Sequence, residues 1–308
     1  MNLAVGQTFS LAITDNLKCY TWGLNDNLQL ARNSDPSNLH CQPDKCTPLQ
    51  NLEPKILTCG DDHALMIDYN GNVYAWGAND RGQLGLGHTR PSRNIVNLSR
   101  LGKNVKYIQT KGSTSYVINS QGQVMKWPNP EHLEKFCPVN IPLRDSSVTF
   151  TSLAAGNGFV VALSQNGLLW SQGRNTFGQL GLGDFNKRDG FDLIRYFKTS
   201  GEKVTQVSAG FAHVICKGSA GKIFTWGLND QGQLGSGLSE PSNSPIIPKI
   251  TDNKNNQLKV KCVSAGFSNC YALMDNKAVY SVGANATTLG VNRYFTKYFF
   301  HYLKITQT

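Results

Sequence analysis

Two histidines occupy corresponding positions in repeated segments of the chain, and they are the first residues to consider for chemistry. His63 and His213 each stand three residues after a glycine, in CGDDH and AGFAH. If the two loops lie close together, paired imidazoles could exchange protons with a substrate. The remaining histidines fall in variable segments with no suitable nucleophile. We expect each imidazole of the pair to hydrogen-bond backbone within its own repeat.

Carboxylates and thiols offer no clearer catalytic pattern. Asp61 and Asp62 are adjacent, so in a loop they point in different directions and do not face each other across a substrate. The eight cysteines are irregularly spaced without a CxxC pair, which argues against a zinc ribbon or a redox motif. Free thiols in a reducing compartment are the expected state. The sequence therefore predicts no enzyme active site, no metal and no cofactor.

The GQLGLG strings at residues 82–87 and 178–183 superficially resemble phosphate-binding loops. A phosphate-binding loop lies between a strand and a helix and commonly has a lysine before serine or threonine. Neither condition holds, and the string recurs within a larger repeat. We interpret these glycines as turn residues.

The overall composition indicates a folded chain with a basic surface. Hydrophobic residues make up 40% of the sequence and charged residues 16%, and the formal charge is +10. A positive balance favours acidic partners such as an acidic protein surface, with nucleic acid as a weaker alternative. No run of five basic residues is present, and no apolar stretch approaches the roughly 18 residues that cross a bilayer. We therefore expect no membrane insertion.

A repeated unit positions all of these residues. Six copies follow one another at intervals of about fifty residues, which is the period of propeller blades and solenoid repeats. Each copy begins at a glycine: Gly6, Gly60, Gly112, Gly156, Gly210 and Gly266. Its two short apolar runs flank a turn such as Asn70-Gly71, the strongest short signal for a hairpin, with both turn residues expected at positive φ. G-x-N-x-x-G-Q-L-G then follows in the best-matching copies.

These features predict a single all-β propeller over residues 1–308. Several strands per unit, a fixed period and the lack of a long amphipathic helix are typical of blades. We expect Trp22, Trp76, Trp170 and Trp226 to lie between neighbouring blades. We also expect the ends to meet, with residues 298–308 joining the N-terminal strand to close the ring and leave no exposed edge. Six blades are predicted, with a truncated seven-bladed ring as the alternative.

The units G-x-x-H-x-x-A-L and D/N-G-x-V-Y-x-W-G-x-N-x-x-G-Q-L-G resemble the regulator of chromosome condensation repeat family along essentially the whole chain. The founding member is an exchange factor for a small GTPase of the Ran type and docks on chromatin. The resemblance implies that residues just after the leading glycines contact the partner. The candidate partner-binding residues are Asp61, Asp62, His63, Asn157, Phe159, Phe211, His213, Phe267 and Asn269.

The aromatic members of this set allow two interpretations. Phenylalanines in the loops could form an apolar centre for a protein partner, or they could pack inside the propeller. Acidic residues occur in only one loop, and no inserted wedge interrupts the G-x-N-x-x-G-Q-L-G segments. We therefore favour a non-catalytic protein-interaction scaffold in the cytoplasm or a cytoskeletal assembly, with a nuclear location possible. The alternatives are an exchange factor for a Ran-like GTPase and a chromatin-binding protein.

Overall fold

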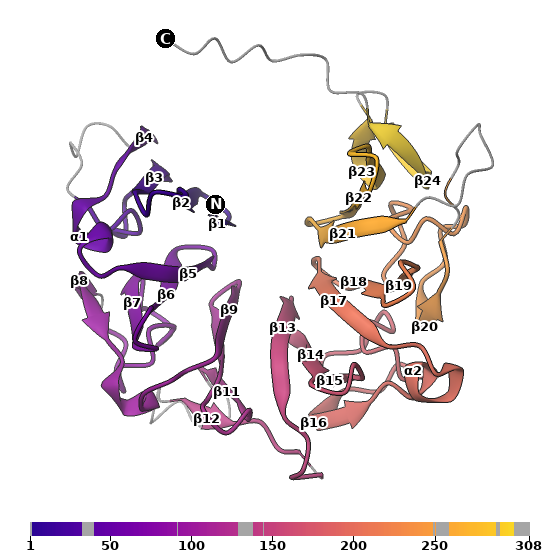
Figure 1. Ribbon diagram of the computed structural model, residues 1–308, viewed down its shortest axis with the longest axis horizontal. Coiled ribbons are helices and arrows are strands. Elements are labelled where there is room, and N and C mark those ends of the chain that lie inside the picture. The colour runs from indigo at the N-terminus through magenta and orange to yellow at the C-terminus, as the bar shows by residue number, and fades with distance from the viewer. Residues whose placement is uncertain are drawn as a thin grey trace. The chain divides into compact units, whose positions relative to one another are not determined.

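The computed structural model describes residues 2–32, 40–90, 92–128, 138–143, 145–248, 250, 259–287 and 290–298. The chain divides into two compact units, Met1–Ala155 and Gly156–Thr308, which are called unit 1 and unit 2 below. Each unit is built from four-stranded antiparallel sheets in which strands adjacent in sequence pair with each other (Figure 1). No helix in the described ranges is long and apolar enough to span a membrane.

Unit 1 begins with three successive sheets. The first contains β1 (Asn2–Val5), β2 (Phe9–Ile13), β3 (Cys19–Leu24) and β4 (His40–Lys45). The second contains β5 (Pro54–Cys59), β6 (His63–Asp68), β7 (Val73–Gly77) and β8 (Ser92–Asn97). The third contains β9 (Tyr107–Lys111), β10 (Thr114–Ile118), β11 (Val124–Trp127) and β12 (Val139–Asn140). Short helical turns, α1 (Thr47–Gln50) and η1 (Ser99–Leu101), connect them.

The fourth sheet contains β13 (Phe150–Gly156), β14 (Phe159–Ser164), β15 (Leu169–Gly173) and β16 (Arg188–Leu193). The boundary between the two units falls at the end of β13. The fifth contains β17 (Val204–Ala209), β18 (His213–Gly218), β19 (Ile223–Gly227) and β20 (Ser242–Ile246). The sixth contains β21 (Val260–Ala265), β22 (Asn269–Met274), β23 (Val279–Thr287) and β24 (Gly290–Tyr298). Helix α2 (Arg195–Ser200) precedes β17. The six predicted repeats thus correspond to six sheets.

The predicted hairpin turns are present, but their conformation differs from the expectation. Between β6 and β7, Gly71 has a φ of +77°, whereas Asn70 is not among the residues with positive φ. The amide of Gly71 donates to the carbonyl of Asp68 at 3.1 Å, and the amide of Asp68 donates to Asn72. This pattern fits a turn followed by one left-handed glycine, so only the second residue needs glycine's freedom. In the last sheet Lys277, not its neighbouring asparagine, takes the positive φ.

Tryptophans join neighbouring sheets. The indole N–H of Trp76 donates to the carbonyl of Gln29 at 2.9 Å, and that of Trp226 donates to Gln179 at 3.0 Å. Trp127 makes the same bond to Gln83 at 2.8 Å. All three indoles are buried, so each bond also satisfies a polar group inside an apolar cluster. The expected role is confirmed for Trp76 and Trp226.

The remaining predicted tryptophans differ. Trp22 and Trp170 are only half-buried. Trp170 stands one residue after the start of its strand, where β7 has Tyr74, and Gln172 stands where β7 has Trp76. The prediction that Trp170 corresponds to Trp76 was therefore wrong, because Trp170 corresponds to Tyr74.

Two larger expectations stay predictions. Closure of a ring by residues 298–308 depends on residues after Tyr298, which lie outside the described residues. The first sheet already has four strands, with β1 supplied by the N-terminal segment. A single domain over residues 1–308 likewise stays a prediction.

Candidate functional site

Each sheet has two ends with different chemistry. The loop end is where the first and second strands join, directly after the leading glycine of each repeat, and the G-x-N-x-x-G-Q-L-G segment starts there. The hairpin end is the opposite end, where the second and third strands join. All nine candidate residues from the sequence lie at the loop end or at the first position of the second strand.

The leading position of the repeat requires glycine, because the side chain of the third residue after it folds back over this position. A Cβ on Gly60 would lie 2.3 Å from Cε1 of His63 and 2.5 Å from the carbonyl oxygen of Gly112 in the next sheet. A Cβ on Gly210 would lie 2.1 Å from Cε1 of His213. No side chain can be accommodated at such distances without movement. The repeat thus packs an aromatic ring or an imidazole under four of the six loops, with Ser115 and Asn269 at the same position in the third and sixth repeats.

His63 and His213 belong to the core, and their hydrogen bonds differ from the expectation. Both are fully buried. Nε2 of His63 lies 2.8 Å from Oγ of Ser115, and Nε2 of His213 lies 3.2 Å from the carbonyl oxygen of Asn269. Nε2 of each imidazole therefore bonds the following sheet, whereas a backbone bond within its own repeat was expected. Burial lowers the pKa of His63 to about 4, so the ring is neutral at physiological pH.

Unit 1 carries an acidic cluster at its loop end, formed by Asp26, Asp61, Asp62 and Asp80. The hydroxyl of Thr8 donates to Oδ1 of Asp62 at 3.2 Å, which lowers the pKa of that carboxyl. Partial burial and the negative charges of the other three aspartates outweigh this bond and raise the pKa of Asp62. Such a cluster attracts cations and basic side chains.

Unit 2 carries an aromatic pair at its loop end. The ring centroids of Phe211 and Phe267 are 4.7 Å apart with an interplanar angle of 32°. Phe267 remains 64% exposed, although phenylalanine usually buries its ring. Backbone bonds hold the pair, because the amide of Phe211 donates to the carbonyl of Phe267 at 3.0 Å and Asn157 donates to Phe211 at 2.8 Å.

The other candidates of unit 2 are less accessible. Phe159 is fully buried in the apolar cluster that includes Val161 and Leu180. Asn269 is half-buried, and its amide donates to the carbonyl of Ala284 at 3.3 Å. Of the two interpretations for the loop phenylalanines, internal packing thus applies to Phe159 and surface presentation to Phe267.

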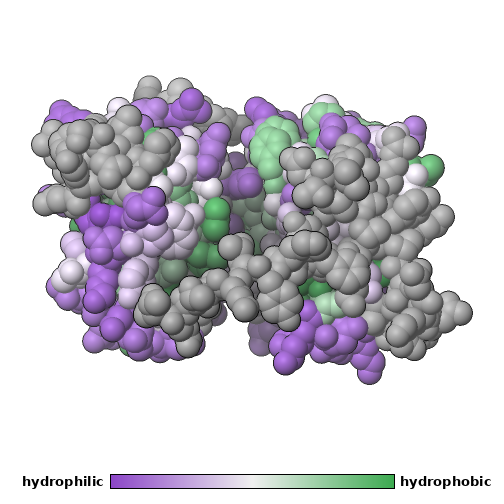
Figure 2. Space-filling view, turned by 90° about the horizontal axis from the view of Figure 1, so that it is seen from above, coloured by the Kyte–Doolittle hydropathy of each residue, from purple (hydrophilic) through white to green (hydrophobic). Residues whose placement is uncertain are grey.

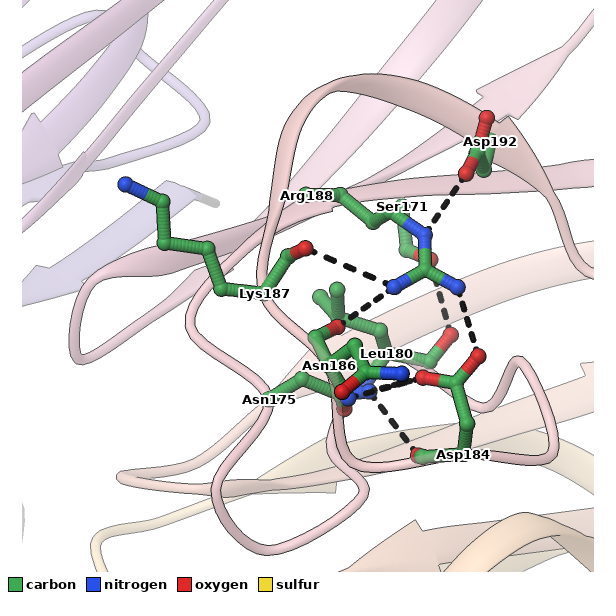
Figure 3. Close-up of polar contacts among 8 residues, drawn as sticks. All are labelled: Ser171, Asn175, Leu180, Asp184, Asn186, Lys187, Arg188 and Asp192. Atoms are coloured by element: carbon green, nitrogen blue, oxygen red, sulfur yellow. Dashed lines mark hydrogen bonds and ion pairs between the residues drawn. The ribbon is translucent and has the colours of Figure 1, made fainter.

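Sequence reasoning missed an ordered loop at the same end of unit 2, shown in Figure 3. The guanidinium of Arg188 donates to Asp184 at 2.6 Å and to Asp192 at 2.7 Å, and it also binds the carbonyl of Asn186. The amide of Asn175 donates to the carbonyl of Asp184 at 2.9 Å. This network holds Phe185 with half of its surface exposed. The available signal was the two adjacent basic residues of DFNKRDGFD with aspartates on both sides of them.

The described residues contain no group of three or more His, Cys, Asp or Glu side chains arranged to hold a metal ion. On the side seen in Figure 2, hydrophilic residues form much of the described surface and hydrophobic residues occupy smaller areas.

Comparison with known proteins agrees with this architecture. The family model of the RCC1-like domain matches residues 1–297. The Ultraviolet-B receptor UVR8 of Arabidopsis thaliana is 26% identical over 276 residues, covering 87% of this chain and 61% of the receptor. The Secretion-regulating guanine nucleotide exchange factor of Mus musculus is 30% identical over 253 residues, covering 77% of this chain and 53% of that protein. The chain spans less than two thirds of the length of these relatives.

Among solved structures, Prp20p from Saccharomyces cerevisiae, described with its binding properties to Gsp1p and histones, superposes with a TM-score of 0.80. Its sequence is 22% identical, and the match covers 96% of this chain and 76% of Prp20p. This likeness shows the fold. The predicted fold class, an all-β propeller with six blades, is confirmed.

Proposed function

This chain belongs to the RCC1-like domain family, and on that premise we propose that it is a non-catalytic protein-interaction scaffold. The proposed contact surface is the loop end of unit 2, centred on the aromatic pair. The family includes exchange factors and interaction proteins, so membership leaves the choice between binding and exchange to features of this chain.

The exposure of Phe267 carries the proposal. An exposed phenylalanine ring loses favourable burial, and aromatic residues are over-represented among the anchors of protein interfaces. Its position is fixed by Phe211 beneath it, so little side-chain entropy is lost when a partner covers it. Asn157, exposed and bonded to the same backbone, supplies a polar edge.

The experiment is a quantitative affinity purification with the wild-type chain and Phe267→Ala. We expect a stoichiometric protein to be recovered with the wild type and its affinity to fall about thirtyfold with the variant, because truncating an anchor costs about 2 kcal/mol. Ile247→Ala is the matched control, since Ile247 is an exposed apolar residue of the same unit that follows the end of β20 away from the loop end. Equal recovery from wild type and Phe267→Ala would contradict the proposed contact surface.

A second function, exchange of guanine nucleotide on a small GTPase of the Ran type, is supported by a different observation. Asp61 and Asp62 of the acidic cluster lie on a loop that the family resemblance assigns to partner contact, and Asp26 and Asp80 add negative charge beside it. The mouse relative is named as an exchange factor. In this alternative, Asp62 contacts a basic patch of the GTPase.

Release of fluorescent GDP from a Ran-like GTPase tests this alternative. Catalytic amounts of the chain should speed release, and Asp62→Ala should reduce the acceleration about tenfold. Asp189→Ala is the control, because Asp189 is an exposed acid that pairs with Lys187 in unit 2. If the wild type leaves the release rate unchanged, exchange activity is excluded for that GTPase and the scaffold remains.

We propose an intracellular location, cytoplasmic or cytoskeletal, because the cysteines that the structure describes in full are free thiols. A nuclear location with chromatin binding is the remaining alternative. Chromatin binding predicts affinity for nucleosomal DNA that falls steeply with salt. A chain that shows no such affinity would remove this alternative.

A further inference from the structure

The hairpin end of unit 2 is basic. Lysines gather on the turns and strand ends there: Lys203, Lys217, Lys222, Lys259, Lys261 and Lys277. All are exposed except Lys217, which is half-buried. We call these six residues the lysine ridge. The surface is separate from the aromatic pair, which lies at the opposite end of the same sheets.

Backbone contacts make the ridge continuous across the fourth, fifth and sixth sheets. A Cβ on Gly167, in the turn of the fourth sheet, would lie 3.1 Å from Cβ of Lys203. The carbonyl of Lys203 accepts from Ser219 in the turn of the fifth sheet at 2.7 Å. A Cβ on Gly221, in the turn of the fifth sheet, would lie 3.8 Å from Cα of Lys259 in the sixth sheet. The lysines therefore sit on connected turns and not on independent loops.

Negative charge on the ridge is limited in the described part of the chain. Two acids accompany the six lysines, Glu202 and Asp275. The Glu202 side chain is largely buried and lies 3.9 Å from Nζ of Lys222. Nζ of Lys217 donates to the carbonyl of Lys261 at 3.0 Å, which satisfies the ammonium without neutralising it. The ridge therefore keeps a net positive charge.

An exposed aliphatic residue lies between the middle of the fifth sheet and the same end. β20 runs from the loop end, where Ser242 pairs with Gly227, towards the hairpin end as far as Ile246, which pairs with Thr225 in the middle of β19. Ile247 follows directly and is 60% exposed. Proteins bind a lipid interface through two contributions, the attraction of basic side chains to anionic headgroups and the burial of apolar side chains.

Unit 1 repeats this combination at its own hairpin end. Tyr69, in the turn between β6 and β7, is 55% exposed. The segment containing Lys103 and Lys106 lies beside this turn, because a Cβ on Gly71 would be 2.8 Å from Cα of Asn104. Both lysines are exposed. Tyrosine and lysine are residues that favour the headgroup region of a bilayer.

We propose that the lysine ridge of unit 2 binds the surface of an anionic lipid bilayer. Its ammonium groups contact headgroup phosphates and carboxylates, and Ile247 enters the interface without spanning it. Clusters of four to eight lysines or arginines are typical of segments that bind acidic lipids. Binding at this end leaves the loop end of unit 2 free for a protein partner.

Other polyanions fit the ridge less well. Specific RNA or single-stranded recognition relies on aromatic or arginine planes that stack on bases, and the six ridge residues are all lysines. An exposed isoleucine contributes nothing to contacts with a phosphate backbone, whereas it gains free energy by entering lipid. We therefore favour a bilayer over nucleic acid.

Flotation of the full chain with lipid vesicles tests the proposal. The chain should float with vesicles of phosphatidylcholine and phosphatidylserine in a ratio of about 7 to 3, and not with phosphatidylcholine alone. The triple variant Lys222→Gln, Lys259→Gln and Lys261→Gln should bind at least about tenfold more weakly. Raising the salt concentration should release the wild type, because screening weakens exposed charges.

A matched control removes the same charge elsewhere. Arg81→Gln, Arg90→Gln and Lys187→Gln alter three exposed cations away from the hairpin end, and this variant should float like the wild type. Thermal unfolding of both triple variants checks that the fold is retained. Equal losses of vesicle binding in the two triple variants would overturn the proposal, as would a wild type that binds duplex DNA but not the acidic vesicles.

The variant Ile247→Ser tests the aliphatic contribution by itself. It should weaken flotation although the charge of the chain is unchanged.

Discussion

The imidazole of His63 in the second sheet of unit 1 lies 2.8 Å from the hydroxyl of Ser115 in the third sheet. Ser115 in turn donates to the carbonyl of Gln83 at 2.9 Å, and Trp127 donates to the same carbonyl. All of these groups are buried. The third residue after the leading glycine thus links neighbouring blades through polar side chains. The sequence had first suggested proton transfer at this position.

Acid should destabilise unit 1 through His63. Its pKa is lowered to about 4 in the folded state, against about 6.5 when unfolded, so the unfolded state binds the extra proton first as pH falls. The stabilisation is complete above about pH 6.5 and is lost towards pH 4, with about 2 kcal/mol gone near pH 5. Urea unfolding near pH 7 and pH 5 measures this loss. His63→Gln should show a smaller pH dependence, and an unchanged dependence would contradict the assignment.

Removing one indole N–H should weaken the contact between blades of unit 2. Trp226→Phe leaves the carbonyl of Gln179 without its donor, and we expect a loss of about 1–3 kcal/mol in unfolding free energy. Trp170→Phe is the control, because no hydrogen-bond acceptor lies within reach of the Trp170 indole among the described residues. That variant should lose less than about 1 kcal/mol. Similar losses in both would assign the effect to packing alone.

Alanine substitutions at two glycines with positive φ distinguish the cost of a steric clash from the cost of backbone strain. Gly77 has a φ of +98°, and its Cβ would lie 2.5 Å from the carbonyl oxygen of Asp62. Gly102 has a φ of +76° with no atom within 4 Å. We expect Gly102→Ala to cost about 1 kcal/mol and Gly77→Ala to cost about 3 kcal/mol or more. Thermal denaturation of the two variants measures the difference, and equal costs would refute the clash.

The loop that presents Phe185 should loosen when its arginine is replaced. Arg188→Lys cannot bind Asp184 and Asp192 together, because an ammonium lacks the planar fork. We expect chymotrypsin to cleave after Phe185 about tenfold faster, since cleavage requires local opening. Lys187→Gln removes an exposed neighbouring charge and should cleave at the wild-type rate. Unchanged cleavage of Arg188→Lys would mean that other contacts order the loop.

Repeat spacing alone was sufficient to predict the six sheets, the hairpins and the glycines at the loop end. Local rules explain this success, because alternating apolar residues and Asn-Gly turns act over a few neighbouring residues. Trp170 shows where the local rule fails. Trp170 occupies the second position of β15, whereas Trp76 occupies the fourth position of β7, and Trp170 therefore pairs with Ala162 and lies nearer the hairpin end.

By itself, the sequence determined the fold class, because a unit that cannot bury both faces of its sheet must stack on its copies. Tertiary structure decided which loop residues are available to a partner. His63, His213 and Phe159 occupy the same repeat column and fold inwards, whereas Phe267 lies against Phe211 and remains exposed. Tertiary structure also gathered the lysine ridge from separate turns. Exposure and charge clustering depend on contacts between residues far apart in the chain, and no local pattern encodes them.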